Sequence, residues 1–264
     1  MSDPEPSRGT PPALSILDVR VEFGGIIALD GATVGVAPDQ VMGLIGPNGA
    51  GKTTLFNCVS RLYEVQSGSI EVHGTDVLAR RPDQVAGLGV ARTFQNVGVF
   101  PTETVLDNVL VGAYPRTRGG MWATALGLPS IRRSERTERE RARALLAELE
   151  LTAYADEVAG QLPFGSLKRL ELARALMMEP RLLMLDEPAN GLTHGEVLEL
   201  AELVRGLRGS HGFAVLLVEH NMDMVASLCD EVTVLELGRT IAVGTPDQVR
   251  SDPRVIEAYL GGAE

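Results

Sequence analysis

Residues 41–54 read VMGLIGPNGAGKTT, and this stretch decides the fold. The apolar run at 41–45 predicts a buried strand, and the residues that follow 54 predict a helix. Between them, GPNGAGKTT (46–54) matches G-x-x-x-x-G-K-[ST] at full spacing. The glycines let several backbone N–H groups turn toward one anion, and the following helix presents its positive end. The stretch therefore predicts a nucleoside triphosphate site.

The residue types in this loop indicate its ligand contacts. Lys52 would reach the β- and γ-phosphates, and Thr53 would hold Mg²⁺ through its hydroxyl. A plain strand-to-helix connection would need neither side chain. The loop residues predicted to contact nucleotide are Gly46, Asn48, Gly49, Gly51, Lys52, Thr53 and Thr54.

The composition bounds the class of protein. The chain has 264 residues, 44% hydrophobic and 22% charged, which is enough for a substantial core. Its formal net charge of −11 disfavours nucleic acid as a partner bound through bulk charge. Cys58 and Cys229 lie far apart without metal-ligand spacing, so we interpret them as buried free thiols in a reducing compartment.

No targeting or membrane-spanning segment is expected. No apolar run approaches the roughly 18 residues that span a bilayer. Residues 1–13, MSDPEPSRGTPPA, lack the apolar core of a signal peptide and predict a disordered leader. The sequence therefore predicts a soluble protein that is not exported.

Strand and helix patterns follow one another along the chain. Alternating or continuous apolar runs predict strands at 17–23, 33–36, 41–45, 68–72, 182–185 and 215–218, and a hairpin within 232–243. Helical spacing predicts an insert of helices from 102 to about 179, a helix at 196–207 and a short one at 255–260. Arginines and glutamates interleave at 132–143, which leaves open a solvated helix with i,i+4 pairs or a docking face.

Polar residues end two of the predicted buried strands. Asp186 and Glu187 follow one of them, and His220 closely follows the other. Ligands of open α/β sheets bind at the carboxyl ends of the strands. Asp186 fits an Mg²⁺ role through water, and Glu187 fits a base or polariser for an attacking water. His220 fits either a structural or a phosphate-facing role.

Phe23 ends the first predicted strand, upstream of the phosphate loop. On spacing alone, a core aromatic and an aromatic that stacks on a nucleobase are equally open.

The motifs together resemble the ATP-binding-cassette (ABC) ATPases in order and spacing. They are GPNGAGKTT, Gln95, LPFGS at 162–166, LLMLDEP at 182–188 and His220. The resemblance runs from about residue 14 to the C-terminus. Four longer stretches look like the ATPase subunits of branched-chain amino acid importers: GVARTFQNVGVFPTETVLDNVLVG, LPFGSLKRLELARAL, DEPANGL and DPRVIEAYLGG.

The resemblance implies an α/β P-loop fold. Its RecA-like core and antiparallel β subdomain would occupy 14–95 and 180–264, and its inserted α-helical subdomain about 96–179. Phe23 then looks like the aromatic that stacks on adenine. Gln95 looks like the glutamine that touches Mg²⁺ and the attacking water, Glu187 like the catalytic glutamate, and His220 like the histidine on the γ-phosphate.

LPFGS resembles the signature motif LSGGQ, which faces the γ-phosphate of ATP held by another subunit. Leu162, Gly165 and Ser166 are the expected contacts. Pro163 replaces the usual serine, so one hydroxyl contact is either missing or moved to Ser166. Thr193 stands where relatives commonly carry an aspartate, which predicts altered communication between the two half-sites.

The family implies ATP and Mg²⁺ as ligands and two kinds of partner. A second ATPase subunit, identical or paralogous, would complete the site. Transmembrane permease subunits would dock a helix near Gln95, Val97 and Phe100, with a substrate-binding protein as an indirect partner. The chain would then lie in the cytoplasm, on the inner face of the plasma membrane. Alternatives are a urea or amide importer, a lipopolysaccharide-type exporter, a non-transport ATPase and a regulatory module without turnover.

We expect Lys52→Ala to lose nucleotide affinity, because the variant lacks the cation that neutralises the β- and γ-phosphates. Calorimetric titration with ATP measures this loss. Unchanged ATP binding would contradict the assignment of the phosphate loop.

Overall fold

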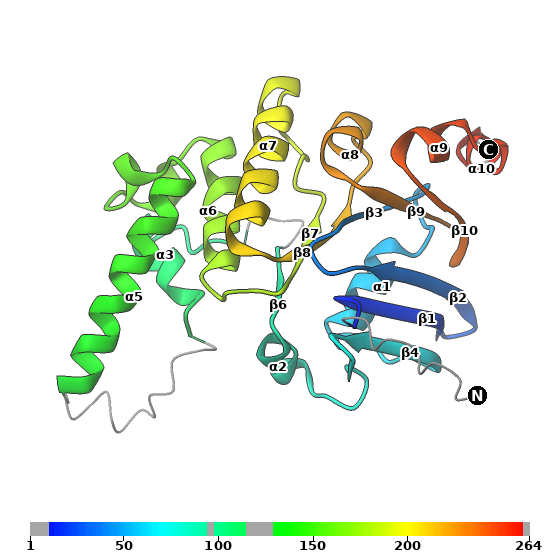
Figure 1. Ribbon diagram of the computed structural model, residues 1–264, viewed down its shortest axis with the longest axis horizontal. Helices are drawn as coiled ribbons and strands as arrows, with labels where there is room; N and C mark the ends of the chain where they lie inside the picture. The colour runs from blue at the N-terminus through cyan, green and yellow to red at the C-terminus, as the bar shows by residue number, and fades with distance from the viewer. Residues whose placement is uncertain (1–10, 94–97, 115–128, 261–264) are drawn as a thin grey trace, which may run out of the picture.

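The computed structural model describes residues 11–93, 98–114 and 129–260 (Figure 1). Most of the predicted leader, residues 1–10, lies outside this part of the chain. The described strands form two sheets. A four-stranded antiparallel sheet has the order β2-β1-β4-β5, and a six-stranded sheet has the order β10-β9-β3-β8-β7-β6.

The antiparallel sheet consists of β1 (Leu14–Phe23), β2 (Ile26–Val36), β4 (Ser67–Val72) and β5 (Thr75–Asp76). The six-stranded sheet consists of β3 (Val41–Ile45), β6 (Val90–Arg92), β7 (Leu182–Asp186), β8 (Ala214–Val218), β9 (Glu231–Glu236) and β10 (Arg239–Gly244). Its central strands pair in parallel, and only β10 runs antiparallel to its neighbour.

The described helices are α1 (Lys52–Val59), α2 (Pro82–Val85), α3 (Val105–Val111), α5 (Pro129–Glu148), α6 (Phe164–Leu176), α7 (His194–His211), α8 (Met222–Leu228), α9 (Pro246–Ser251) and α10 (Pro253–Leu260). In Figure 1, α3, α5 and α6 stand together at one end of the molecule, away from the antiparallel sheet. None of the helices in the described ranges is long and apolar enough to cross a bilayer.

Two hydrophobic cores lie on opposite faces of the six-stranded sheet. Every residue of β3, β7 and β8 is buried. Side chains alternate between the faces of a strand. On β8, Val215 and Leu217 accordingly join the core under the helices, while Leu216 and Val218 join the core shared with α1 and the antiparallel sheet. Burial on both faces explains why these strands read as continuous apolar runs.

The carboxyl ends of the three central strands are level with one another. Asp186 on β7 pairs with Val218 on β8, and Leu44 on β3 also pairs with Val218. The residues that follow these strands therefore meet at one edge of the sheet. This register places the phosphate loop, the acidic pair and His220 at the same edge.

Each predicted strand and helix is present, and several bounds differ. β2 begins at Ile26, earlier than expected, because Gly24 and Gly25 adopt positive φ and close a hairpin with β1. The sequence at 90–101 is typical of a strand that runs into a loop, and β6 ends at Arg92. Helical spacing at 142–151 predicts a helix as far as 151, but α5 ends at Glu148 and Glu150 adopts φ 59°. The pattern did not predict β5, α8 or α9. The division into subdomains at the boundaries given above stays a prediction.

The arginine-rich segment forms part of α5, and one of its ion pairs is of the i,i+4 kind expected for a solvated helix, while Arg141 and Arg143 pair with Glu179 and Asp156 outside α5. Arg136 and Glu140 form an i,i+4 ion pair at 2.9 Å, and both side chains are exposed. Such pairs contribute a few tenths of a kcal/mol.

Both cysteines are free and buried. Burial raises the pKa of the Cys58 thiol to about 11 and that of Cys229 to about 12. Both thiols therefore stay protonated near neutral pH, as expected for structural residues.

Asn108 on α3 holds the segment that carries Phe100. Its side-chain oxygen accepts from the Phe100 N–H at 2.7 Å, and its amide donates to the carbonyls of Phe100 and Thr104 at 3.0 and 2.9 Å. The side chain is fully buried. Phe100 itself is 48% exposed, so Asn108 fixes the backbone beneath an exposed aromatic ring.

We expect Asn108→Ala to lower the free energy of unfolding by about 2–4 kcal/mol, because buried backbone groups lose their partners. Urea denaturation measures the change. The matched control is Asn190→Ala at an exposed position, with an expected change within about 0.5 kcal/mol. Equal unfolding free energies for the two variants would contradict the role given to Asn108.

Candidate functional site

The phosphate loop connects β3 to α1 through backbone that only glycine adopts easily. Gly46, Gly49 and Gly51 have φ values of 150°, 80° and 102°. A Cβ on Gly46 would lie 2.1 Å from the carbonyl oxygen of Leu235, and one on Gly51 would lie 2.7 Å from that of Ala28. Gly46 and Gly51 are thus required by packing as well as by conformation, and Gly49 by conformation.

Lys52 begins α1 and folds back over the loop. Its Nζ donates to the carbonyl oxygens of Gly46 at 2.7 Å and Pro47 at 3.0 Å. The side chain is buried, which lowers its pKa, while the charge of Glu187 acts in the opposite direction. A phosphate bound in the loop would supply the negative charge that a buried ammonium favours.

The remaining loop residues leave the backbone accessible. Asn48, Gly49 and Thr53 are exposed, and a Cβ on Gly49 would meet open space. The start of α1 adds its unpaired N–H groups and the positive end of its dipole. These features fit the phosphates of a nucleotide.

Asp186 ends β7 and is buried in an ion pair. Its Oδ2 accepts from Arg92 at 2.8 Å, and its backbone N–H donates to the Thr93 hydroxyl at 3.4 Å. Across the described ranges no cluster of three or more His, Cys, Asp or Glu residues could hold a metal ion. Mg²⁺ commonly uses one or two protein oxygens besides phosphates and water, so Thr53 and Asp186 fit it by donor type.

Glu187 follows β7 in a left-handed conformation. Its φ is 48°, and its N–H donates to the carbonyl of Val218 at 2.9 Å. This bond ties the end of β7 to the end of β8. The His220 Nδ1 lies 3.8 Å from Glu187 Oε1. The structure therefore brings the two residues together, as the sequence predicted.

Glu219 is a buried carboxylate that organises both loops. One oxygen accepts from the Ala189 N–H at 2.7 Å, and the other accepts from the N–H groups of His220 and Asn221 at 2.9 and 3.0 Å. Its side chain has no exposed surface. Sequence reasoning passed over Glu219 because adjacency to His220 gave no sign that its side chain turns back to the backbone.

Phe23 is accessible at the end of β1. Its ring is 44% exposed and meets Tyr63 edge-on, with centroids 5.0 Å apart and planes at 72°. Such an edge contact leaves a ring face for another aromatic. The exposed ring suits stacking on a base better than a place in the core.

The LPFGS segment (162–166) leads into α6, and it is separate from the phosphate loop and from the loops that follow β7 and β8. Leu162 is buried, and Gly165 and Ser166 lie in the first turn of α6. A Cβ on Gly165 would lie 3.0 Å from Glu196 Oε1, so α7 covers this turn from one side. The Phe164 ring occupies the space beside Gly191.

Thr193 caps α7. Its hydroxyl and its N–H donate to Glu196 Oε2 at 2.7 and 2.8 Å. The bond with the Thr193 backbone is the main reason that the pKa of Glu196 is lowered. The threonine that replaces the usual aspartate thus has a partner within its own subunit.

Some of the predicted site is missing from the described residues, and other contributors were not predicted. Gln95 and Val97 lie outside the described ranges. Tyr259 on α10 was quoted only as part of a family stretch. Burial raises its pKa, and a hydrogen bond with the backbone of Gly46 lowers it in part, so α10 reaches the phosphate loop. No sequence spacing connects residues so far apart.

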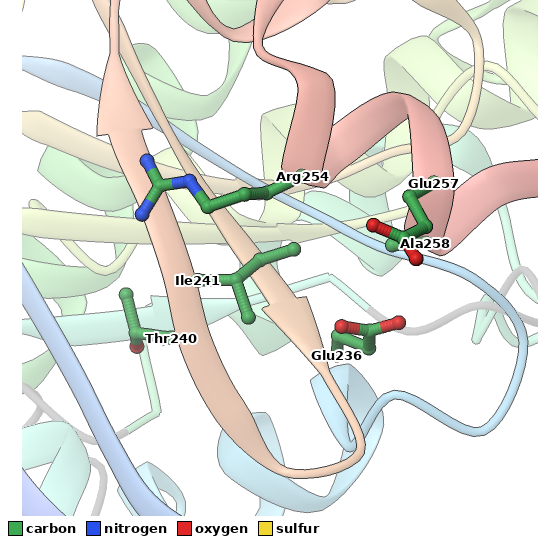
Figure 2. Close-up of a pocket in the computed structure, with 6 residues that line it drawn as sticks. All are labelled: Glu236, Thr240, Ile241, Arg254, Glu257 and Ala258. Atoms are coloured by element: carbon green, nitrogen blue, oxygen red, sulfur yellow. The ribbon is translucent and has the colours of Figure 1, made fainter.

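A cavity of about 610 Å³ lies between the β9–β10 hairpin and α10 (Figure 2). Figure 2 shows Glu236, Thr240 and Ile241 on the hairpin side, with Arg254, Glu257 and Ala258 on the helix. Arg254 is already paired with Asp252 at 2.7 Å. None of these lining residues belongs to the predicted site, so we place the site by its motifs and not by this cavity.

Comparisons with known proteins identify the family. The ABC transporter family model matches residues 29–190, and the model described as branched-chain amino acid ATP-binding cassette transporter matches residues 239–264. The chain is 42% identical to the high-affinity branched-chain amino acid transport ATP-binding protein BraF of Pseudomonas aeruginosa. It is 40% identical to LivG of Escherichia coli K12, which has the same description. Each match covers 96% of this chain and 99% of the relative.

Among solved structures, the chain resembles an ATP-binding cassette of an ABC transporter in its ADP conformation. The TM-score is 0.81 at 29% identity, over 96% of this chain and all of that one. Fold and site together define a P-loop ATPase. The chain belongs to the ABC transporter family, as an ATP-binding subunit of a transporter.

We expect Glu219→Gln to lower the turnover of ATP roughly tenfold and to leave ATP affinity within about twofold. The amide NH₂ would face backbone N–H groups that need an acceptor, and the loops carrying Glu187 and His220 would shift. Steady-state ATPase rates and calorimetry measure the two quantities. Glu202→Gln, an exposed change on α7, is the matched control. Equal rates in both variants would exclude this positioning role.

Proposed function

We propose that this chain powers an importer of branched-chain amino acids by binding and hydrolysing ATP on Mg²⁺. The likeness to BraF and LivG over nearly the whole chain carries this proposal, because both relatives are described as branched-chain amino acid transport proteins. The match of the C-terminal segment to a model of the same description supports it independently.

The nucleotide would bind across the edge where β3, β7 and β8 end. Phe23 would stack on adenine, while the loop amides, Lys52 and Thr54 would hold the phosphates. Thr53, Gln95 and, through water, Asp186 would hold Mg²⁺. When bound, the ion supplies positive charge to the phosphate oxygens.

Hydrolysis needs a positioned water and a stabilised γ-phosphate. Glu187 would accept the proton of the attacking water, and His220 would contact the γ-phosphate from the neighbouring loop. Their 3.8 Å separation lets both act on one small region. Glu219 keeps both loops in register through its three accepted N–H bonds.

A second ATPase subunit would complete each site. The first turn of α6, with Gly165 and Ser166, presents N–H groups that suit the γ-phosphate of ATP on the partner. Pro163 offers no hydroxyl there, so Ser166 would supply it. ATP would therefore close two subunits head to tail, and hydrolysis would release them.

Permease subunits would receive the resulting motion. Phe100, which follows Gln95 closely in the sequence, is exposed and held by Asn108, and a helix of a membrane subunit would dock there. We place the chain at the cytoplasmic face of the membrane on this basis, with a substrate-binding protein as an indirect partner.

We expect Glu187→Gln to bind ATP like the wild type and to turn it over roughly 100-fold more slowly or worse, because it lacks the base. ATPase assays and calorimetry measure both. Near-normal turnover would remove Glu187 from the catalytic role.

The assembly is tested by light scattering after size-exclusion chromatography of Glu187→Gln, with and without MgATP. We expect a dimer that forms only with MgATP. If Glu187→Gln binds ATP but stays monomeric, the second ATPase subunit is a paralogue and not a second copy of this chain. The cargo is tested by uptake of labelled leucine, isoleucine and valine in a deletion strain. We expect the wild-type chain to restore this uptake and Lys52→Ala not to restore it. Restored uptake of urea or amides alone would refute it.

A further inference from the structure

Arg92, the last residue of β6, connects three elements around the predicted Mg²⁺ site. One guanidinium nitrogen donates to Asp186 Oδ2 at 2.8 Å. The other donates to Asn57 Oδ1 at 2.8 Å and to the Ser60 hydroxyl oxygen at 3.1 Å. The guanidinium carbon lies 5.4 Å from the centroid of the Phe56 ring.

The geometry of α1 suits this contact. Phe56 and Asn57 lie in the last turn of α1, and Ser60 is its C-cap. Positions three and four apart share a face of a helix, so these residues lie on the face toward Arg92. The Ser60 hydroxyl donates to the Phe56 carbonyl at 2.9 Å, which leaves its lone pairs for the guanidinium. The planar fork of arginine serves α1 and β7 at once, whereas an ammonium is a single point charge.

Stability alone is a poor reason for this arrangement. The Arg92 side chain is 11% exposed and that of Asp186 is 5% exposed. A buried ion pair loses most of its Coulombic gain to desolvation, so an apolar pair of similar volume is often as stable. An arginine that bonds a predicted metal-site carboxylate through one nitrogen and α1 through the other is better explained by the orientation it imposes.

We infer that Arg92 is a positioning residue that sets the plane of the Asp186 carboxylate for Mg²⁺. Arg92 lies on β6, the strand that precedes Gln95 in the sequence. Its side chain is held in place by α1, the helix that follows the phosphate loop. This inference rests on the metal role proposed for Asp186. Because Oδ2 is held by the guanidinium, Oδ1 is the oxygen we assign to the water shell of the ion.

The neighbouring residue strengthens the connection. The Thr93 hydroxyl accepts from the Asp186 N–H, so both the backbone and the side chain of Asp186 are set by the end of β6. Arg92 pairs in register with Met184 of β7, two residues before Asp186. A shift of Arg92 and Thr93 would therefore change the orientation of the Asp186 carboxylate.

The test measures how much Mg²⁺ improves ATP binding, in a Glu187→Gln background in which turnover is strongly slowed. ATP affinity is determined by calorimetry in EDTA and across an Mg²⁺ titration, and Mn²⁺ binding by electron paramagnetic resonance gives a second readout. We expect Arg92→Lys and Arg92→Met to keep ATP affinity in EDTA within about twofold of the parent, since the contacts of Arg92 are with α1 and Asp186 and not with the phosphate loop. The enhancement by Mg²⁺ should fall roughly 10- to 100-fold.

Three further variants make the outcome decisive. Asn57→Ala removes only the hydrogen bond between Asn57 and Arg92, so it should lower the Mg²⁺ enhancement by a smaller factor. If Arg92→Met does not fold, Asn57→Ala takes its place in the test. Arg181→Met, whose guanidinium binds the Leu88 carbonyl at 3.1 Å, is the matched control and should change nothing. Asp186→Asn should lose the enhancement.

An unchanged enhancement in Arg92→Lys and Asn57→Ala, with a loss in Asp186→Asn, would overturn the inference alone. An unchanged enhancement in Asp186→Asn would overturn the metal role on which it rests. A stronger enhancement in Arg92→Met would show that the guanidinium competes with the ion and would also overturn the positioning role.

Discussion

The close packing of the phosphate loop against the β9–β10 hairpin is the constraint on which the rest of the structure depends. Gly46 leaves no room for a Cβ beside the Leu235 carbonyl. The Gly238 N–H donates to the Ala50 carbonyl at 3.0 Å, and the Gly238 carbonyl accepts from Asp30 at 2.9 Å. Residue 238 thus ties the loop to the antiparallel sheet. The loop keeps its anion-binding shape because two distant parts of the chain, the β9–β10 hairpin and β2, enclose it.

Level strand ends then turn this loop into a site. β3, β7 and β8 finish at matching positions in the register, so Gly46, Glu187 and Glu219 each begin the segment after a buried strand. The apolar strands supply the rigid base, and the exposed edge supplies the polar groups. Chemistry at the ends of buried strands is positioned accurately because strand pairing fixes those ends.

Two buried charges organise the edge further, and they act in different ways. Arg92 uses its donors to join α1 and β7 around Asp186, while Glu219 uses its acceptors to join the loops after β7 and β8. Both charges are satisfied by several hydrogen bonds, which is the condition for burying an ionised group. Gly165 and Ser166 lie apart from this network, in the first turn of α6, and the proposed function assigns them to the nucleotide of a second subunit.

The sequence by itself determined the phosphate loop, the buried parallel strands and the placement of Glu187 and His220 at one edge of the sheet. These features depend on local spacing and on the rule that ligands meet strand ends. Only the tertiary structure revealed the contacts of Arg92, Glu219 and Tyr259, and it showed Thr193 capping its own helix. Each of these contacts depends on where a side chain turns relative to partners that packing brings close, and local periodicity carries no information about that direction.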